Sequence, residues 1–359
     1  MVYDIVIVGG GPSGSTLARM LDEKYKVLLI DKRNLYDEIN FKREKCCGGL
    51  LAPDAQKVLA QFGLGLPKDV IVGPQMFSVR SIDIDNHILK YYQRHYINVH
   101  REKFDRWLLS LVPQNVQVMT SCIFKGYRET EGNIEVEVFN QGVTEKISTK
   151  LLVGADGATS KVRRMAFEND KLPDRYVSIQ KWYKTSKESP HFISIFDEEV
   201  TDFYSWVIQK EDYAIVGAAI LDYANANEKF QILVEKLRKK GYEFGKCIKR
   251  EGTWIMRPRK LNQINLFKGN VALIGEAGGF ISPSSAEGIS YALKSGAILA
   301  DCINHSMKNY GLRYKRKTTK LRINIFVKNL KSLLMYNKFT RKLIMKTGVL
   351  AMEVHKNVY

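Results

Sequence analysis

The stretch from Tyr3 to Asp31, YDIVIVGGGPSGSTLARMLDEKYKVLLID, decides the fold. An apolar, β-rich run, Ile5 to Val8, leads into a glycine-rich turn that ends at Gly14. A segment with helical spacing of apolar residues follows, and a second apolar run ends at Asp31. This order predicts a βαβ unit with a GxGxxG fingerprint at its first turn.

Each glycine of the fingerprint has a distinct predicted role. Gly9 allows a tight turn, Gly11 lets the backbone approach a pyrophosphate, and Gly14 lets the helix pack closely on the strand. Asp31 is placed to accept hydrogen bonds from a ribose diol. The motif predicts a dinucleotide site without separating NAD from FAD. Further candidate cofactor-binding residues beside it are Pro12, Ser13 and Lys32.

Length and composition are typical of a globular protein. The chain has 359 residues, of which 45% are hydrophobic and 26% charged. Five irregularly spaced cysteines indicate a reducing compartment rather than a disulfide framework. We expect no signal peptide before the first strand, and no apolar run approaches the ~20 residues of a membrane span. The sequence therefore predicts a cytoplasmic protein.

The net charge of +18 is concentrated near the C-terminus. Between Cys302 and Met352 there is no Asp or Glu, but there are thirteen Lys and Arg. Apolar residues recur among these cations at roughly helical spacing, which predicts a basic amphipathic segment over 308–346 that contacts an anionic membrane surface. Two alternatives are a helix pair docked on the body and a site for an acidic electron-carrier protein. No nucleic-acid reader fold is recognisable.

The order of the remaining segments predicts a discontinuous organisation. Residues 116–119, 134–138 and 146–148 form an expected small antiparallel sheet. Residues 176–220 form an expected larger sheet, and an apolar run at 271–274 returns to the first domain. The predicted domains are an FAD-binding domain (1–70, 100–170 and 258–305), a substrate domain (71–99 and 171–257) and a basic helical extension (306–359).

Four motifs occur in a fixed order. They are GxGxxG with Asp31, Arg101 at the start of a helical segment, GADGATSKVR at 154–163, and Gly275-Glu276-Ala277. Together they resemble the flavoprotein superfamily typified by para-hydroxybenzoate hydroxylase. The resemblance implies FAD as cofactor, Arg101 on the phosphate and ribose side, and Asp156 near both FAD and NAD(P)H. It also implies a Rossmann-like α/β domain with an antiparallel-sheet substrate domain.

Two of these acidic positions carry a second interpretation. The superfamily usually has Gly-Asp where this chain has Gly275-Glu276, so Glu276 keeps the carboxylate but adds one methylene. Asp156 also suits a turn or helix-capping role before Ser160.

A closer resemblance lies with the geranylgeranyl reductase family. Residues 280–289, FISPSSAEGI, are similar to the segment that family places against the flavin ring, and 45–50, KCCGGL, to its Lys-x-Cys-Gly segment. The resemblance implies flavin contacts by the following residues: Lys45, Cys46, Pro283, Gly288 and Ile289. A helix N-terminus at this place favours the anionic edge of reduced flavin.

Tyr204 and Trp206 resemble part of that family's YxWxFP substrate motif. The chain departs from it at Thr201, Ile208 and Gln209. On a strand the two aromatic side chains share one face, where they line an apolar substrate pocket or form the core of the second domain.

Cys47 is the candidate proton donor or substrate-positioning group. Reduction of an alkene needs a hydride from flavin and a proton delivered separately. The structural alternative is a buried small hydrophobe in a glycine-rich loop. No paired histidine spacing indicates a metal site.

The sequence therefore predicts an FAD-dependent oxidoreductase that reduces carbon–carbon double bonds of a prenyl-type or other apolar substrate. NAD(P)H or a ferredoxin-like protein would supply electrons, since there is one dinucleotide fingerprint. One alternative is a flavin monooxygenase or halogenase of an aromatic substrate. Another is a flavoprotein for electron transfer or partner modification.

Overall fold

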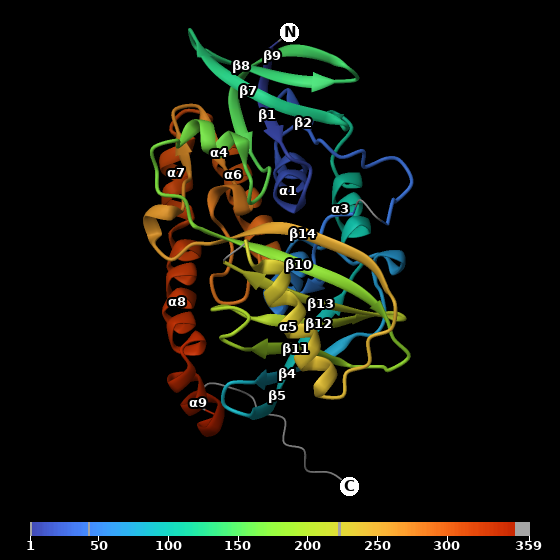
Figure 1. Ribbon diagram of the computed structural model, residues 1–359. Helices are drawn as coiled ribbons and strands as arrows, with labels where there is room; N and C mark the ends of the chain where they lie inside the picture. The colour runs from blue at the N-terminus through green and yellow to red at the C-terminus, as the bar shows by residue number, and fades with distance from the viewer. Residues whose placement is uncertain (1, 42–43, 222–223, 349–359) are drawn as a thin grey trace. The chain divides into compact units, whose positions relative to one another are not determined.

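The computed structural model describes residues 2–41, 44–221 and 224–348. The chain divides into two compact units. Unit 1 comprises Met1–Ile39, Glu102–Pro173 and Met256–Lys328, and unit 2 comprises Asn40–Arg101, Asp174–Ile255 and Asn329–Tyr359. The three-domain division predicted from the sequence stays a prediction. Figure 1 shows the chain with its labelled elements.

Unit 1 is built on a sheet whose strand order is β15-β16-β9-β1-β2-β6. Strand β1 lies between β2 and β9 and is parallel to both, and β16 continues the parallel arrangement beside β9. The strands of this unit are β1 (Val2–Val8), β2 (Val27–Ile30), β6 (Gln117–Met119), β7 (Cys122–Thr130), β8 (Asn133–Asn140), β9 (Val143–Gly154), β15 (Phe267–Lys268) and β16 (Val271–Leu273).

Strand β9 takes part in two kinds of pairing. Its residues from Val143 to Thr149 pair with β8 antiparallel, and those from Ser148 to Gly154 run parallel to β1. The predicted small antiparallel sheet is thus made of β7, β8 and β9. The expectation that residues 116–119 belong to it was wrong, because β6 pairs with β2 in parallel. A short apolar strand carries no pattern that distinguishes these two partners.

Alternating side chains of β1 bury into two separate cores. Ile5 and Ile7 face a cluster formed with α1 and α6, whereas Val6 and Val8 face a cluster formed with β7, β8 and α4. This period of two is the pattern of a strand covered on both faces. The helices of unit 1 include α1 (Pro12–Met20), α4 (Lys161–Ala166), α6 (Ile289–His305) and α7 (Tyr310–Lys317). Most of α3 (Arg101–Ser110) and the first part of α8 (Thr319–Tyr336) also belong to it.

Unit 2 is built on a sheet of order β14-β10-β13-β12-β11-β4-β5-β3. Its inner pairs are antiparallel except for β4 and β11, which are parallel. The α5 helix packs its apolar side chains, Phe230 and Leu233 among them, against the buried core of this sheet. The elements are β3 (Leu50–Leu51), α2 (Pro53–Gln61), β4 (Met76–Asp83), β5 (Ile88–Asn98), β10 (Asp174–Lys184), β11 (His191–Phe196), β12 (Ser205–Lys210), β13 (Tyr213–Ile220), α5 (Ala226–Lys239) and β14 (Cys247–Arg257).

The C-terminal region is helical, as predicted. It continues from α7 into α8 (Thr319–Tyr336) and α9 (Lys338–Thr347). Tyr310 and Tyr314 of α7 are buried in the core of unit 1, and the hydroxyl of Tyr314 donates to the Leu273 carbonyl at 3.1 Å. Residues 349–359 of the predicted extension lie outside the described part of the chain.

Candidate active site

The predicted nucleotide-binding residues of unit 1 gather at one edge of its sheet. Because β1, β2, β9 and β16 are parallel, their carboxyl ends lie on the same side. The residues that follow those ends are Gly9, Asp31, Asp156 and Gly275. This edge is where open α/β sheets bind their ligands.

The N-terminus of α1 has the features of a phosphate site. Gly11 is its N-cap and provides no side-chain hydrogen bond, and Pro12 occupies the first turn. A Cβ added to Gly11 would meet no heavy atom within 4 Å, so the space in front of it is open. By contrast, a Cβ on Gly14 would lie 1.9 Å from the carbonyl oxygen of Gly9, so only glycine fits there. Amide groups without protein partners at such a helix start suit an anion.

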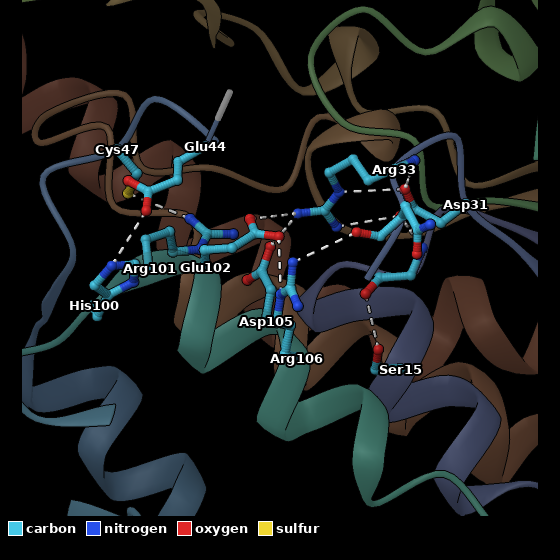
Figure 2. Close-up of polar contacts among 12 residues, drawn as sticks. Ser15, Asp31, Arg33, Glu44, Cys47, His100, Arg101, Glu102, Asp105 and Arg106 are labelled. Carbon is cyan, nitrogen blue, oxygen red and sulfur yellow. Dashed lines mark hydrogen bonds and ion pairs between the residues drawn. The ribbon is translucent and has the colours of Figure 1, made fainter. Parts of the chain in front are cut away.

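Asp31 is buried and lies at the start of an ionic cluster, shown in Figure 2. Its Oδ2 accepts from the Gly10 amide at 2.7 Å, which holds the glycine turn to the end of β2. Arg33 then links Asp31 at 3.2 Å to Asp105 of α3 at 3.0 Å. Burial by itself would lower the pKa of Arg33, but the carboxylates of Asp105 and Asp31 outweigh it and raise that pKa. The neighbouring Lys32 is exposed.

Asp156 accepts from the first amides of α4, whose N-cap is Ser160, and keeps one oxygen available. Its Oδ2 accepts from the Lys161 amide at 2.7 Å at the start of α4. Its Oδ1 is buried, with no hydrogen-bond partner in the part of the chain that the structure describes. Burial raises the pKa of this carboxyl above its usual value. A buried acceptor without a partner is an exception among folded proteins and suits a donor such as a ligand hydroxyl.

The segment around Gly275 and Glu276 is held rigidly. Glu276 accepts from the Met256 amide at 3.0 Å, and the fully buried Arg163 donates to the Gln263 carbonyl and the Asn265 side chain at 2.6 Å each. Burial lowers the pKa of Arg163 to about 10. Arg163 therefore fastens the GADGATSKVR motif to the backbone that leads into β16.

The predicted ring-binding loop ends at a second helix N-terminus. The carbonyl of Pro283 accepts from Arg257 Nε at 3.0 Å, and the Ser282 amide donates to the Glu287 carbonyl at 2.9 Å. Helix α6 then begins at Ile289 with Gly288 as N-cap. The positive end of this helix is compatible with negative charge on a bound ring. Open space at Gly11, the unpartnered oxygen of Asp156 and two helix starts together fit a dinucleotide with a flavin.

In unit 2, the Cys46-Cys47-Gly48-Gly49 loop packs against β12. A Cβ on Gly48 would lie 2.5 Å from Ile208 Cδ1, so the loop approaches the strand closely. The sulfur of Cys47 accepts from Arg101 Nη1 at 3.3 Å and from the Gly49 amide at 3.4 Å. Figure 2 shows Arg101 beside Cys47, and α3 begins at Arg101 as predicted. Its predicted contact with FAD stays a prediction.

The other predicted residues of this loop differ in exposure. Lys45 is exposed, whereas Cys46 is buried, and burial raises the pKa of the Cys46 thiol. Cys46 and Cys47 are both free thiols in the structure. Cys47 is only partly buried, so it is the more accessible of the two sulfurs.

Tyr204 and Trp206 lie close together at the start of β12, with ring centroids 5.5 Å apart. Val207 of this strand belongs to the core beneath α5, whereas Trp206 does not. Trp206 and Ile208 therefore share the opposite face, on which the Cys47 loop packs. Burial raises the pKa of the Tyr204 phenol, and negative charge on Tyr96 or Cys47 would act in the same direction.

Lys210, at the end of β12, is a residue that the sequence analysis missed. It is buried, and its Nζ donates to Asn98 Oδ1 at 2.5 Å and to the Val99 carbonyl at 2.7 Å. The Gly49 carbonyl lies 3.5 Å away. Burial lowers the pKa of Lys210 to about 7, although the nearby Cys47 acts in the opposite direction. The sequence offered one hint of this role. Lys210 lies two positions beyond Ile208, so on a strand the two side chains share a face.

Three comparisons with known proteins agree with this arrangement. The model of a family described as "FAD binding domain" matches residues 2–309. Protein CbrA of Escherichia coli O6:H1 (strain CFT073) is 40% identical over 347 residues, which is 97% of this chain and 94% of that protein.

Two solved structures share the fold. One is a geranylgeranyl bacteriochlorophyll reductase-like protein from Thermoplasma acidophilum, with a TM-score of 0.81, 19% identity and coverage of 98% of this chain and 92% of that one. The other is PqsL of Pseudomonas aeruginosa, described as a probable FAD-dependent monooxygenase. Its TM-score is 0.69 and its identity 17%, and the match covers 96% of this chain and 100% of that one. The predicted fold of para-hydroxybenzoate hydroxylase type and the predicted FAD cofactor are thereby confirmed.

Proposed function

The chain belongs to the FAD binding domain family of FAD-dependent oxidoreductases, and from this premise we propose that it reduces carbon–carbon double bonds of a prenyl-type or other apolar substrate. The observation that carries the proposal is that the loop bearing Cys47 packs on the face of β12 that Trp206 and Ile208 share, with the Tyr204 ring 5.5 Å from that of Trp206. A thiol beside an aromatic, largely buried surface suits an apolar substrate that needs one proton.

The reaction adds a hydride and a proton across the double bond. FAD, which the Gly9–Gly14 turn and the segments at Asp156 and Gly275 would hold, would in its reduced form supply the hydride for one carbon of the double bond. Cys47 gives its proton to the other carbon and regains one from water. Arg101 and the Gly49 amide, which both donate to the sulfur, stabilise the negative charge left on it in between.

The remaining residues of unit 2 position the substrate and the loop. The rings of Tyr204 and Trp206 provide apolar contact area, and the phenol of Tyr204 stays neutral because burial raises its pKa. Lys210 holds the carbonyls of Val99 and Gly49 and so fixes the backbone that carries Cys47.

The electron donor, the partners and the location are also part of the proposal. We assign electron supply to NAD(P)H or a ferredoxin-like protein and the location to an anionic membrane surface. In the described part of the chain, no helix has the length and apolar character needed to cross a bilayer.

The test is anaerobic single-turnover kinetics. The FAD-loaded protein is photoreduced and mixed with a prenyl lipid in a stopped-flow spectrometer, and the recovery of oxidised flavin absorbance is followed together with the saturated product. We expect the Cys47→Ala variant to react at least about 100-fold more slowly, because a positioned proton donor contributes at least this much. Cys247→Ala removes an exposed thiol of the same unit and should react at the normal rate.

Two results would contradict the reductase proposal. One is reoxidation that the lipid does not accelerate, while oxygen yields a hydroxylated or halogenated aromatic product; the monooxygenase or halogenase alternative would then lead. The other is a normal rate in Cys47→Ala, which would remove the proton-donor role. Flavin reduction without turnover of any small molecule would favour the electron-transfer alternative.

A further inference from the structure

Helices α8 and α9 expose large apolar side chains on their outer surface. Five of these in unit 2, which we call the outer stripe, have exposed fractions from 47% to 79%: Leu330, Leu333, Leu334, Phe339 and Leu343. Leu330, Leu333 and Leu334 follow the i, i+3, i+4 spacing of one helix face, as do Phe339 and Leu343 at i and i+4. A contiguous apolar surface of this kind marks an interaction site.

The outer stripe cannot turn inward, because the other side of these helices is anchored in unit 2. Arg341 is 2% exposed and forms ion pairs with Asp83 and Asp85 of the β4–β5 hairpin at 2.8 Å each. Met345, one turn further along α9, is buried too. Figure 1 shows α9 beside β4 and β5. Helix α9 is thus inverted relative to an ordinary surface helix, with a cation inside and apolar residues outside.

The Tyr336 ring gives the end of α8 a second anchor. It lies 5.0 Å from the ring of Phe203 and 5.8 Å from that of Phe196. Since Arg341, Met345 and Tyr336 occupy the inner side, the outer stripe has no place in the core of this unit.

Positive charge surrounds the outer stripe. Lys331, Lys342 and Lys346 are exposed on the same two helices, and the sequence has no Asp or Glu from Cys302 to Met352. All charged side chains of α8 and α9 themselves are cations. An exposed apolar helix face with lysines beside it complements a partner with an apolar interior and anionic groups at its surface. An anionic lipid bilayer has both properties.

We propose that the outer stripe of α8 and α9 lies on an anionic membrane surface, with Leu and Phe side chains at the acyl boundary and the lysines at the lipid phosphates. This inference deepens the proposed membrane location by assigning it to named residues, and it is independent of the reaction. Vesicle binding requires no turnover, so it can fail while the reductase proposal stands, and the reverse also holds.

The test is co-sedimentation of the FAD-loaded full chain with vesicles. One set contains phosphatidylcholine alone and the other an equal mixture with phosphatidylglycerol, each at 50 and 500 mM salt. We expect binding to the anionic vesicles at low salt, at least about tenfold weaker binding to phosphatidylcholine, and loss of binding at high salt.

Two variants separate the apolar and electrostatic contributions. Phe339→Ser with Leu343→Ser should weaken binding to anionic vesicles at least about tenfold, whereas Phe77→Ser, at an exposed phenylalanine of β4, should leave it unchanged. The triple change of Lys331, Lys342 and Lys346 to Gln should weaken it by a similar factor or more. The same change at Lys57, Lys239 and Lys240, which are exposed elsewhere in unit 2, is the matched control for net charge.

Several outcomes would overturn the inference. They are no binding to anionic vesicles at low salt, equal loss in the outer-stripe variants and their controls, and a concentration-dependent dimer that Phe339→Ser with Leu343→Ser abolishes. The last result would assign the outer stripe to a second copy of the chain. Flavin content and the thermal midpoint of each variant show that a loss of binding is not a loss of folding.

Discussion

Arg33 and Lys210 are both cations withdrawn from water, but they have opposite surroundings. Arg33 of unit 1 contacts Asp31, Glu102 and Asp105, and these carboxylates raise its pKa. Lys210 of unit 2 donates only to the neutral oxygens of Asn98, Val99 and Gly49 among the contacts described, and burial lowers its pKa to about 7.

The difference separates a structural cation from one that can change its charge. Arg33 stays protonated at any pH at which the protein folds, so its cluster is a fixed brace for the glycine turn. Because burial lowers its pKa to about 7, Lys210 can lose its proton near neutral pH, and it holds the loop that carries Cys47. Glu211 and Glu44 also act on Lys210, but more weakly than burial. Direct ion pairs such as those of Arg33, rather than burial alone, therefore decide which of these two roles a buried cation takes.

Removal of Arg33 has the largest expected effect. Arg33→Met leaves Asp31 and Asp105 buried without their shared cation, which we expect to lower the free energy of unfolding by about 3 kcal/mol. Urea unfolding followed by circular dichroism measures the loss. Arg316→Met, at an exposed arginine of α7, should change stability by less than about 0.5 kcal/mol.

A second variant keeps this prediction testable. Asp105→Asn, added to Arg33→Met, removes one of the two buried carboxylates that lost their shared cation, and it should recover part of the lost stability. If Arg33→Met alone cost less than about 1 kcal/mol, the cluster would not be the brace described above.

Lys210 should show a pH dependence that Arg33 lacks. Its pKa is about 7 in the folded protein against 10.5 in the unfolded chain, so the unfolded chain binds more protons between these values. Stability from this group therefore rises with pH across that window, by at most about 1.4 kcal/mol per pH unit. The difference in unfolding free energy between the natural protein and Lys210→Met should increase by roughly 2 kcal/mol from pH 7 to pH 9.

Asn98→Asp gives Lys210 a carboxylate partner, like those of Arg33. It places a carboxylate where the Asn98 oxygen now lies 2.5 Å from Lys210 Nζ, so Lys210 should remain charged and the rise from pH 7 to pH 9 should flatten. A pH profile that is flat already in the natural protein would show that Lys210 titrates normally. Denaturant titrations at each pH decide between the two results.

The sequence predicted the surroundings of Arg33 in unit 1 better than those of Lys210 in unit 2. Gly9, Gly11, Gly14 and Asp31 were readable because a local βαβ pattern fixes where the carboxyl ends of parallel strands lie. Arg33 was not singled out, because its partners Glu102 and Asp105 are about 70 positions away on α3. The helix-start role of Asp156 was readable because its contact with the Lys161 amide is local, while its predicted place near FAD stays a prediction.

The unit 2 cluster depends on contacts that no local pattern encodes. Lys210 meets Asn98 only because β12 and β5 belong to one sheet, in which β11 and β4 lie between them. The same limit explains why β6 was paired wrongly and why the apolar residues of α8 and α9 could be read as either inward or outward. Helical spacing predicts that residues share a face, but the partners of that face come from the tertiary fold.

The smallest expected effect concerns Arg106, the second cation of the Arg33 cluster. It lies 3.4 Å from Glu102, one turn earlier on α3, and 20% of its side chain is exposed. Since Arg33 also faces Glu102, at 3.5 Å, Arg106→Gln should cost only about 0.5 kcal/mol. In the Arg33→Met background Arg106 still pairs with Glu102, now without Arg33 to share the charge, so the same change should cost roughly 1 kcal/mol more. A double-mutant cycle by urea unfolding measures this coupling, and strict additivity would mean that the carboxylates are neutralised separately rather than as one cluster.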